Sequence, residues 1–146
     1  MIHPRIAIAL ISALLVTAAV SQTGAKPAAA KGNSLLERGR YLVVDVGNCG
    51  DCHSPRGKDG RPIKGQELEG AQLFFQPMMP VPGWMAVAPG IAGLPGWTDQ
   101  QGITFLTTGK KPDGSMAAPP MPAIRFNKAD ATAVVLYLRS LSPTGK

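Results

Sequence analysis

Two cysteines and one histidine stand together in the sequence Cys49-Gly50-Asp51-Cys52-His53. This C-x-x-C-H pattern is typical of covalent haem attachment, in which two thiols form thioether bonds to the haem vinyl groups and the next imidazole binds the iron. The only other histidine, His3, lies in a segment that we expect to be removed. We therefore predict one haem c, attached through Cys49 and Cys52, with His53 as an axial ligand of the iron.

Other uses of paired cysteines fit this sequence less well. A thioredoxin-type redox motif would follow a strand of a βαβ unit, and no such pattern surrounds Cys49. A structural zinc site needs four ligands, and a second pair of cysteines or histidines is absent from the sequence. A disulfide between Cys49 and Cys52 would leave His53 without a role. Haem attachment is the favoured interpretation.

The N-terminal segment has the features of a secretory signal peptide in their usual order. Arg5 supplies a positive charge, residues 6–20 form a nearly unbroken apolar run, and small residues follow up to Ser21 and Ala25. We expect residues 1–25 to be a signal peptide, which would place the folded part in the periplasm. The alternative is an uncleaved membrane anchor, although the apolar run is shorter than the ~20 residues that span a bilayer.

The remaining composition indicates a tether followed by one domain. Residues 26–33 are rich in Ala, Gly, Lys and Pro and are predicted to form a flexible linker, and residues 34–146 suit one small domain. The formal charge is +6, and removal of Arg5 with the leader leaves +5 (6 − 1). This charge fits docking on an acidic protein surface or on anionic headgroups. It does not indicate nucleic-acid binding, because the sequence has no basic run and no aromatic ladder.

Three helices are predicted from apolar periodicity and from residues that start or stop helices. They begin at Ser34, Thr98 and Asn127, which are residue types that cap helix N-termini. Glu37 and Gln101 complete capping boxes for the first two. The predicted helices end at about Val46 before Gly47, at Gly109, and before Pro143. No strand signal approaches these in strength, so an all-α domain is expected.

The first predicted helix contains a glycine. Leu35, Leu42 and Val46 fall on one apolar stripe, with Gly39 on it or next to it. Glycine inside a helix costs about 1 kcal/mol relative to alanine, so its presence indicates that another element approaches closely.

A long stretch between His53 and Trp97 is punctuated by proline and glycine. A loop of this length in a compact domain needs a reason, and wrapping a haem is a sufficient one. Its apolar side chains have two interpretations: a wall of the haem pocket, which we favour, or a docking face for a partner. They are Phe74, Phe75, Met78, Met79, Trp84 and Met85.

One imidazole leaves the second axial position of the iron to another side chain. A methionine thioether is the natural soft ligand, and it raises the reduction potential. We prefer Met121, because the prolines of Pro119-Pro120-Met121-Pro122 stiffen the backbone around it. Met116 is the alternative. Filling of apolar gaps is the expected role of Met78, Met79 and Met85.

The order of these features resembles that of the class I cytochromes c, over about Ser34 to Leu141. The similarity is greatest to the single-haem modules that serve bacterial periplasmic dehydrogenases. The matching motifs are Arg38-Gly39-Arg40-Tyr41-Leu42, Cys52-His53-Ser54-Pro55-Arg56, Gly96-Trp97-Thr98-Asp99, Pro120-Met121-Pro122 and Tyr137-Leu138-Arg139-Ser140-Leu141.

This resemblance implies three main helices and long loops wrapped around one covalently attached haem. The first and last helices would cross closely, with Gly39 facing Tyr137. The ring nitrogen of His53 that does not bind iron would donate to a backbone carbonyl in the following loop. Trp97 would contact a propionate or pack in the core. The implied haem-binding residues are Cys49, Cys52, His53 and Met121.

The expected function is transfer of single electrons in the periplasm, with a dehydrogenase as donor and an oxidase or another cytochrome as acceptor. The chain is then an electron-transfer protein and not an enzyme, and it associates with a membrane only if the leader is retained. Two alternatives stay open. One is that the chain is the haem subunit of a dehydrogenase or other oxidoreductase complex. The other is a five-coordinate, ligand-binding haem protein in which no methionine reaches the iron.

Overall fold

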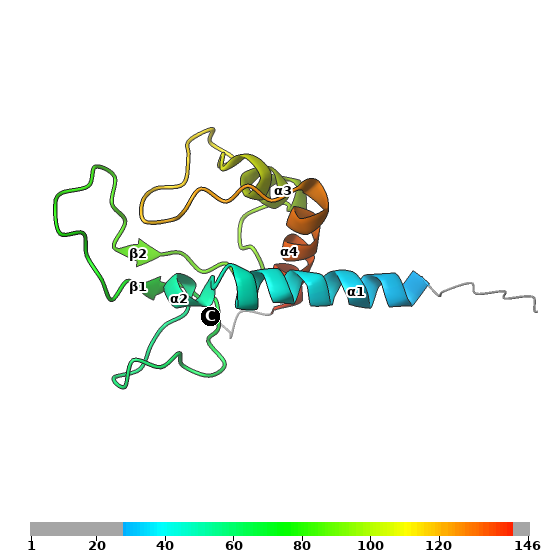
Figure 1. The fold of residues 1–146 in the computed structure, drawn as a ribbon, viewed down its shortest axis with the longest axis horizontal. Coiled ribbons are helices and arrows are strands. Elements are labelled where there is room, and N and C mark those ends of the chain that lie inside the picture. Colours follow the sequence, from blue (N-terminus) through cyan, green and yellow to red (C-terminus); the bar gives the residue numbers. More distant parts are fainter. Residues whose placement is uncertain (1–27, 142–146) are drawn as a thin grey trace, which may run out of the picture.

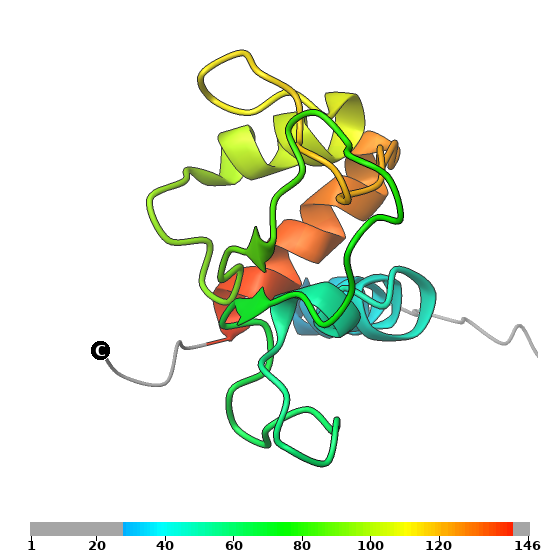
Figure 2. The same ribbon diagram turned by 90° about the vertical axis from the view of Figure 1, so that its left-hand side faces the viewer.

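The structure is a computed structural model that describes residues 28–141, with side chains from Ser34 onward. Four α-helices dominate it, as the predicted all-α class requires, and α1 and α4 cross while α3 packs on α4 (Figure 1). Figure 2 views α1 nearly end-on, with α4 passing across it. In chain order the elements are α1 (Ala28–Tyr41), η1 (Leu42–Val46), α2 (Gly50–His53), β1 (Ala71–Gln72), β2 (Val87–Ala88), α3 (Asp99–Thr108) and α4 (Lys128–Ser140).

Helix α1 begins earlier than predicted. It starts at Ala28 and not at Ser34, so residues 28–33 of the predicted linker are helical and Ser34 does not cap an N-terminus. Three consecutive alanines at positions 28–30, the best helix formers, account for the extension. The predicted signal peptide (1–25) and Pro143 lie outside the described residues. Within residues 28–141, no helix combines the length and apolar character needed to cross a bilayer.

A π-helical turn, η1, follows α1 directly. The N–H of Gly47 donates to the carbonyl of Leu42 at 2.8 Å, a bond that spans five residues. The wider turn rotates the side chains that follow it. Leu42 and Val43 are buried, whereas Leu35 and Val46 are 40% and 50% exposed. The predicted stripe of Leu35, Leu42 and Val46 is therefore wrong at both of its ends.

The crossing of α1 and α4 depends on Gly39. A Cβ atom at this position would lie 2.0 Å from the carbonyl oxygen of Ala133 and 2.7 Å from the Cβ of Tyr137. The two backbones therefore touch at Gly39, as the resemblance implied. Arg38, one residue away, pairs with Asp130 of α4 at 2.9 Å and adds an ionic contact to the crossing.

Helices α3 and α4 begin as predicted. The Thr98 hydroxyl accepts from the Gln101 N–H at 3.2 Å, and the Gln101 side chain accepts from the Thr98 N–H at 2.8 Å, which completes the capping box. Gly109 ends α3 with a left-handed φ of 78°. Asn127 caps α4 by accepting from the Asp130 N–H at 2.9 Å.

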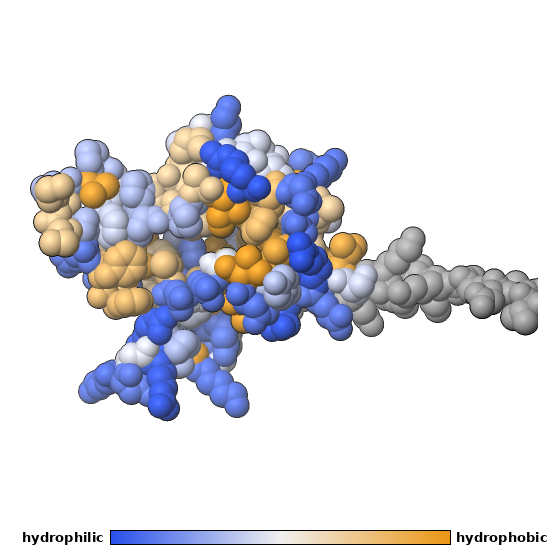
Figure 3. Space-filling view, in the orientation of Figure 1, coloured by the Kyte–Doolittle hydropathy of each residue, from blue (hydrophilic) through white to orange (hydrophobic). Residues whose placement is uncertain are grey.

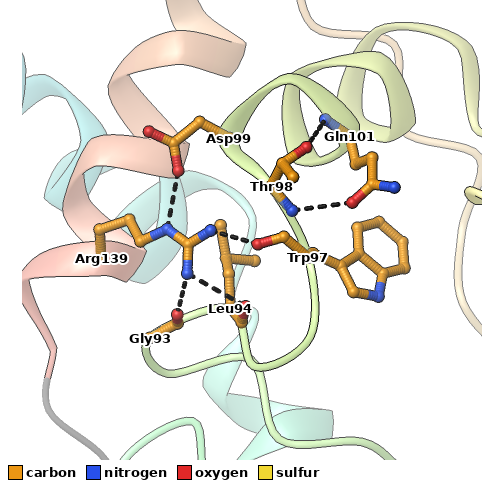
Figure 4. A network of polar contacts seen from close by, with 7 residues as sticks. All are labelled: Gly93, Leu94, Trp97, Thr98, Asp99, Gln101 and Arg139. Carbon is orange, nitrogen blue, oxygen red and sulfur yellow. Dashed lines mark hydrogen bonds and ion pairs between the residues drawn. The ribbon is translucent and has the colours of Figure 1, made fainter.

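Arg139 near the end of α4 fixes the turn that leads into α3 (Figure 4). Its guanidinium pairs with Asp99 at 2.7 Å and donates to the carbonyl of Leu94 at 3.1 Å. It also donates to the carbonyls of Gly93 and Trp97. These charge-assisted bonds hold the loop before α3 against the C-terminal helix.

The apolar core lies where η1, α3 and α4 meet the loop before α3. Its buried members are Leu42, Val43, Leu68, Ala92, Leu94, Leu106, Ala131, Val134, Val135 and Leu138. The long segment after α2 contains the antiparallel pair β1–β2, in which Ala71 faces Ala88 and Gln72 faces Val87. The loop between these strands projects from the body on the left of Figure 1. Strands this short leave no periodic pattern, and none was predicted.

Candidate functional site

The Cys-x-x-Cys-His sequence forms its own short helix. Cys49 is the N-cap of α2 and His53 is its last residue, and the His53 N–H donates to the Cys49 carbonyl at 2.9 Å. Both cysteines are half-buried free thiols, so the disulfide alternative is not adopted. Gly47 allows the chain to turn beside them, because a Cβ there would lie 3.2 Å from the sulfur of Cys49 and 2.8 Å from the Leu42 carbonyl oxygen.

His53 is buried and its ring is held in one orientation. Only 7% of the residue is exposed, and Nδ1 lies 2.7 Å from the carbonyl oxygen of Pro89. A carbonyl only accepts, so the proton is on Nδ1 and the lone pair of Nε2 is free to bind a metal. Burial lowers the pKa of His53, and the bond to Pro89 opposes this only in part, so the ring favours the neutral form that ligates iron. The expectation of a backbone carbonyl acceptor is confirmed, and the acceptor is Pro89.

Two glycines bring Pro89 to His53. The N–H of Gly70 donates to the His53 carbonyl at 2.7 Å, and a Cβ on Gly70 would lie 2.6 Å from the nitrogen of Gly90. A Cβ on Gly90 would in turn lie 2.7 Å from the carbonyl oxygen of Glu69. The backbones of residues 69–70 and 89–90 therefore cross in contact, next to the residue that fixes the imidazole. Sequence reasoning did not find these positions, because each looks like any loop glycine.

Ser54 is a second residue that sequence reasoning did not assign. It is 3% exposed, and its hydroxyl accepts from the N–H of Leu68 at 3.0 Å. Leu68 in turn accepts backbone bonds from Ile91 at 2.8 Å and from Ala92 at 3.0 Å. This chain of bonds joins α2 to the segment that carries Pro89. The motif Cys-His-Ser thus supplies both the predicted ligand and part of its support.

The loop that carries Met121 is fixed to the long segment. The Met85 N–H donates to the Pro119 carbonyl at 2.8 Å, and the Met121 N–H donates to Ala118 at 3.1 Å. The Pro119–Pro120 peptide is cis. Met121 itself is half-buried. This anchored loop is compatible with the predicted role of Met121 as the second axial ligand, which stays a prediction.

Met116, the alternative ligand, lies against the end of α3. It forms an isolated β-bridge with Lys110, and its methyl carbon would be 2.9 Å from a Cβ on Gly109. Almost half of the residue, 48%, is exposed. This packing at Gly109 gives Met116 a contact of its own and favours Met121 as the ligand.

The two tryptophans have different surroundings. Trp97 packs edge-on against Phe105 with ring centroids 5.4 Å apart and lies against the core, which supports the packing role. Trp84 packs against Phe75 at 5.7 Å, and its buried indole Nε1 has no acceptor within residues 28–141. A buried donor without an acceptor costs about 1–3 kcal/mol. A haem propionate is a carboxylate of the kind that this N–H needs, so the residues present fit haem.

The thioredoxin and zinc alternatives find no support in residues 28–141. Burial raises the pKa of the Cys49 thiol, and the charge of Cys52 adds to this, whereas a thioredoxin-type nucleophile needs a lowered pKa. This part of the chain also has no group of three or more His, Cys, Asp or Glu side chains that would hold a metal ion. Haem attachment is therefore the chemistry that the two free thiols of Cys49 and Cys52 and the oriented, neutral imidazole of His53 support.

This combination of fold and site defines a c-type cytochrome. The family model of cytochrome c matches residues 29–142, and the chain belongs to that family. Members of the family bind haem c, and Cys49, Cys52 and His53 supply the attachment motif. The class recognised from sequence and its predicted fold and cofactor are thereby confirmed.

The chain is similar to cytochrome subunits of several dehydrogenases. It is 35% identical over 119 residues to the fructose dehydrogenase cytochrome subunit of Gluconobacter japonicus, covering 75% of this chain and 22% of that protein. It is 29% identical to the cytochrome c subunit of the quinone alcohol dehydrogenase of Gluconobacter oxydans (76% and 25%). It is 32% identical to the gluconate 2-dehydrogenase cytochrome c subunit of Pantoea cypripedii (77% and 27%). The chain thus spans about a quarter of the length of these relatives.

Proposed function

We propose that this chain carries single electrons outside the cytoplasm, with His53 and Met121 as the axial ligands of one haem c. The observation that carries the proposal is the buried imidazole of His53, held by Pro89 at 2.7 Å beside two free cysteines. When bound, the haem supplies an iron that alternates between ferric and ferrous states. The protein holds the imidazole neutral and oriented, and it forms and breaks no covalent bond during the exchange.

The proposed donor is a dehydrogenase. Support comes from the names of the relatives, which are cytochrome subunits of fructose, alcohol and gluconate dehydrogenases. In such an arrangement the catalytic subunit oxidises its substrate and passes electrons one at a time to this chain, which passes them on to an oxidase or another cytochrome. The chain acts either as a freely diffusing carrier or as a haem-bearing subunit of the complex. The proposed location, the periplasm, rests on the predicted signal peptide over residues 1–25.

An absorption spectrum of purified holoprotein in both redox states tests the ligand assignment. Sharp ferrous bands and a ferric methionine-to-iron charge-transfer band are expected. Met121→Ala should abolish the charge-transfer band, and the matched variant Met116→Ala should keep it. Loss of the band in Met116→Ala alone would contradict the assignment. Full binding of carbon monoxide to reduced wild-type protein would favour the five-coordinate alternative.

Co-purification separates the two arrangements. Material extracted from the source organism under mild conditions should contain this chain either alone or with a catalytic dehydrogenase subunit in a fixed ratio. A monomer that still receives electrons from membranes supports the diffusing carrier. A stable complex that reduces the haem on addition of a sugar, alcohol or sugar acid supports the subunit.

A further inference from the structure

We propose that exposed apolar side chains on the loop between β1 and β2 dock a redox protein whose contact face has an apolar centre and an acidic edge. This inference rests on the proposed electron-carrying function and names the surface that performs it. The side chains, called the loop surface below, are Phe74, Met78, Met79, Val81 and Met85.

The loop surface is exposed to an unusual degree. Met78 is 103% exposed, Met79 75% and Phe74 70%. In Figure 3 apolar atoms gather on the projecting loop. The sequence favoured a pocket wall for this segment, and Trp84, with its buried Nε1, fits that role. A side chain in a pocket wall contacts neighbouring wall residues, whereas Met78 is as open as in an extended chain.

The base of the loop is nevertheless held in place. Leu73 donates to Ala86 at 2.8 Å, and the rings of Phe74, Phe75 and Trp84 stack edge to face at 5.3 and 5.7 Å. A preorganised apolar surface loses little conformational entropy when a partner covers it. Methionine side chains adapt their shape to the opposing surface, as weak and reversible contacts require. The surface is therefore suited to repeated, short encounters.

The loop surface lies beside the elements that carry the axial ligands. At one end, the Met85 N–H bonds Pro119, two residues before Met121. At the other end, β2 leads directly to Pro89, which holds His53. The loop surface is thus connected to both predicted axial ligands, through the Met85–Pro119 bond on one side and through β2 and the Pro89–His53 bond on the other. Electron transfer needs this proximity.

Charge around the loop surface selects an acidic edge on the partner. Residues 71–98 contain no charged side chain, so the centre is uncharged. The preceding segment 55–70 carries four basic residues against three acidic ones, a net charge of +1 (4 − 3), and its four basic residues all lie within 56–64. Arg56 from this segment lies over the Phe74 ring at 5.0 Å. Figure 3 shows hydrophilic side chains below the apolar loop.

A hollow joins the basic segment to the loop surface. Its volume is about 700 Å³, and Arg56, Lys58 and Phe74 are among its lining residues. Arg56 already pairs with Asp51 at 2.9 Å, so Lys58 is the lining cation that can meet a carboxylate on the edge of a partner, beside the Phe74 ring. Binding to a membrane surface generally uses an amphipathic helix with a basic face, and the loop surface is not helical. A protein partner is therefore favoured over a lipid surface.

Photo-crosslinking in the source organism tests which molecule binds the loop surface. A benzophenone amino acid replaces Met78 in the full chain, and the matched control replaces Leu136, which is 40% exposed on α4. The expected result is an adduct of position 78 with a flavin-, quinone- or haem-containing protein that position 136 does not form. The crosslinked segment of that protein should contain apolar and acidic residues. Adducts only with lipid, with a second copy or with residues of this same chain would overturn the proposal, as would equal adducts at both positions.

Kinetics provide the second arm. Reduction of purified ferric holoprotein by membranes of the source organism should slow by about fivefold or more in M78S/M79S, since each truncation removes apolar contact area. Leu136→Ser should leave this rate unchanged. Reduction by ascorbate, which needs no protein contact, should be equal in all three proteins. If membranes reduce M78S/M79S as fast as wild type, the proposed docking at the loop surface is wrong. The proposed electron-carrying function would be unaffected. Wild-type haem that membranes never reduce would contradict the proposed function, and this inference with it.

Discussion

The Nδ1 atom of His53 and the carbonyl oxygen of Pro89 lie 2.7 Å apart although 36 residues separate them in the chain. This bond sets the tautomer and the orientation of the imidazole. It exists because the chain returns past α2 through a backbone crossing at Gly70 and Gly90. The orientation of the proposed iron ligand therefore depends on two glycines that are not themselves part of the motif.

Gly70→Ala should impair haem incorporation. Gly70 has a φ of +92°, and an added Cβ would lie 2.6 Å from the nitrogen of Gly90, a backbone atom that cannot move without shifting Pro89. Gly60→Ala is the matched control, since Gly60 has a φ of +77° and no atom within 4 Å of the added Cβ. Both variants carry the conformational cost of about 1–2 kcal/mol for a left-handed residue, and Gly70→Ala adds the clash.

The measurement is the ratio of haem absorbance to protein after export, together with unfolding by denaturant. Gly70→Ala should give a clearly lower haem content than Gly60→Ala. Equal haem content in the two variants would show that the crossing does not orient His53.

Gly39→Ala should destabilise the crossing of α1 and α4. An added Cβ would lie 2.0 Å from the Ala133 carbonyl oxygen, so the helices must move apart. We expect a loss of about 3 kcal/mol or more in the free energy of unfolding. In Gly102→Ala, the control inside α3, the nearest contact is a methyl group of Val135 at 3.0 Å, which can yield. If Gly39→Ala lowers the free energy of unfolding only as much as Gly102→Ala does, the close crossing of α1 and α4 is contradicted.

Trp84→Phe should raise the pKa of a haem propionate. A hydrogen bond to the charged form of a carboxylate lowers its pKa, and the variant removes the donor Nε1. The inflection in the pH dependence of the reduction potential should therefore move to higher pH. Trp97→Phe should leave the inflection in place, because Trp97 makes an edge-on contact with Phe105 that another ring retains. A shift in Trp97→Phe and none in Trp84→Phe would reverse the assignment.

Arg38→Gln should reduce stability in a pH-dependent way. The guanidinium of Arg38 lowers the pKa of Asp130 in the folded protein below its usual value of 3.8. A lowered folded pKa contributes stability above the unfolded value, and this stability is lost as pH falls through the folded pKa. Urea unfolding should therefore separate variant from wild type at about pH 7 and bring them together at about pH 2. A difference that persists unchanged in acid would show that the ion pair is not its source.

Local signals made the starts of α3 and α4 and the end of α3 predictable. The side chains that cap these helices are contiguous with them, as in the pair Thr98 and Gln101, so the pattern and the structure coincide. The attachment motif was readable for the same reason. The π turn at residues 42–46 was not, because it depends on how Leu42 and Val43 pack in the core.

Long-range features escaped prediction. Pro89, Gly70 and Gly90 come together only after the segment folds back, and no local pattern records which carbonyl will meet His53. Gly39 was the exception, because glycine within a helical pattern is itself a local anomaly that indicates close approach.

Covalent attachment of haem through Cys49 and Cys52 is the claim on which the account depends. Extraction of exported wild-type protein with acid acetone, followed by intact mass spectrometry, tests it most directly. The pigment should stay with the polypeptide, and the mass should exceed that of the bare chain by one haem. Colourless protein after extraction, with pigment in the solvent and a mass equal to that of the bare chain, would contradict it.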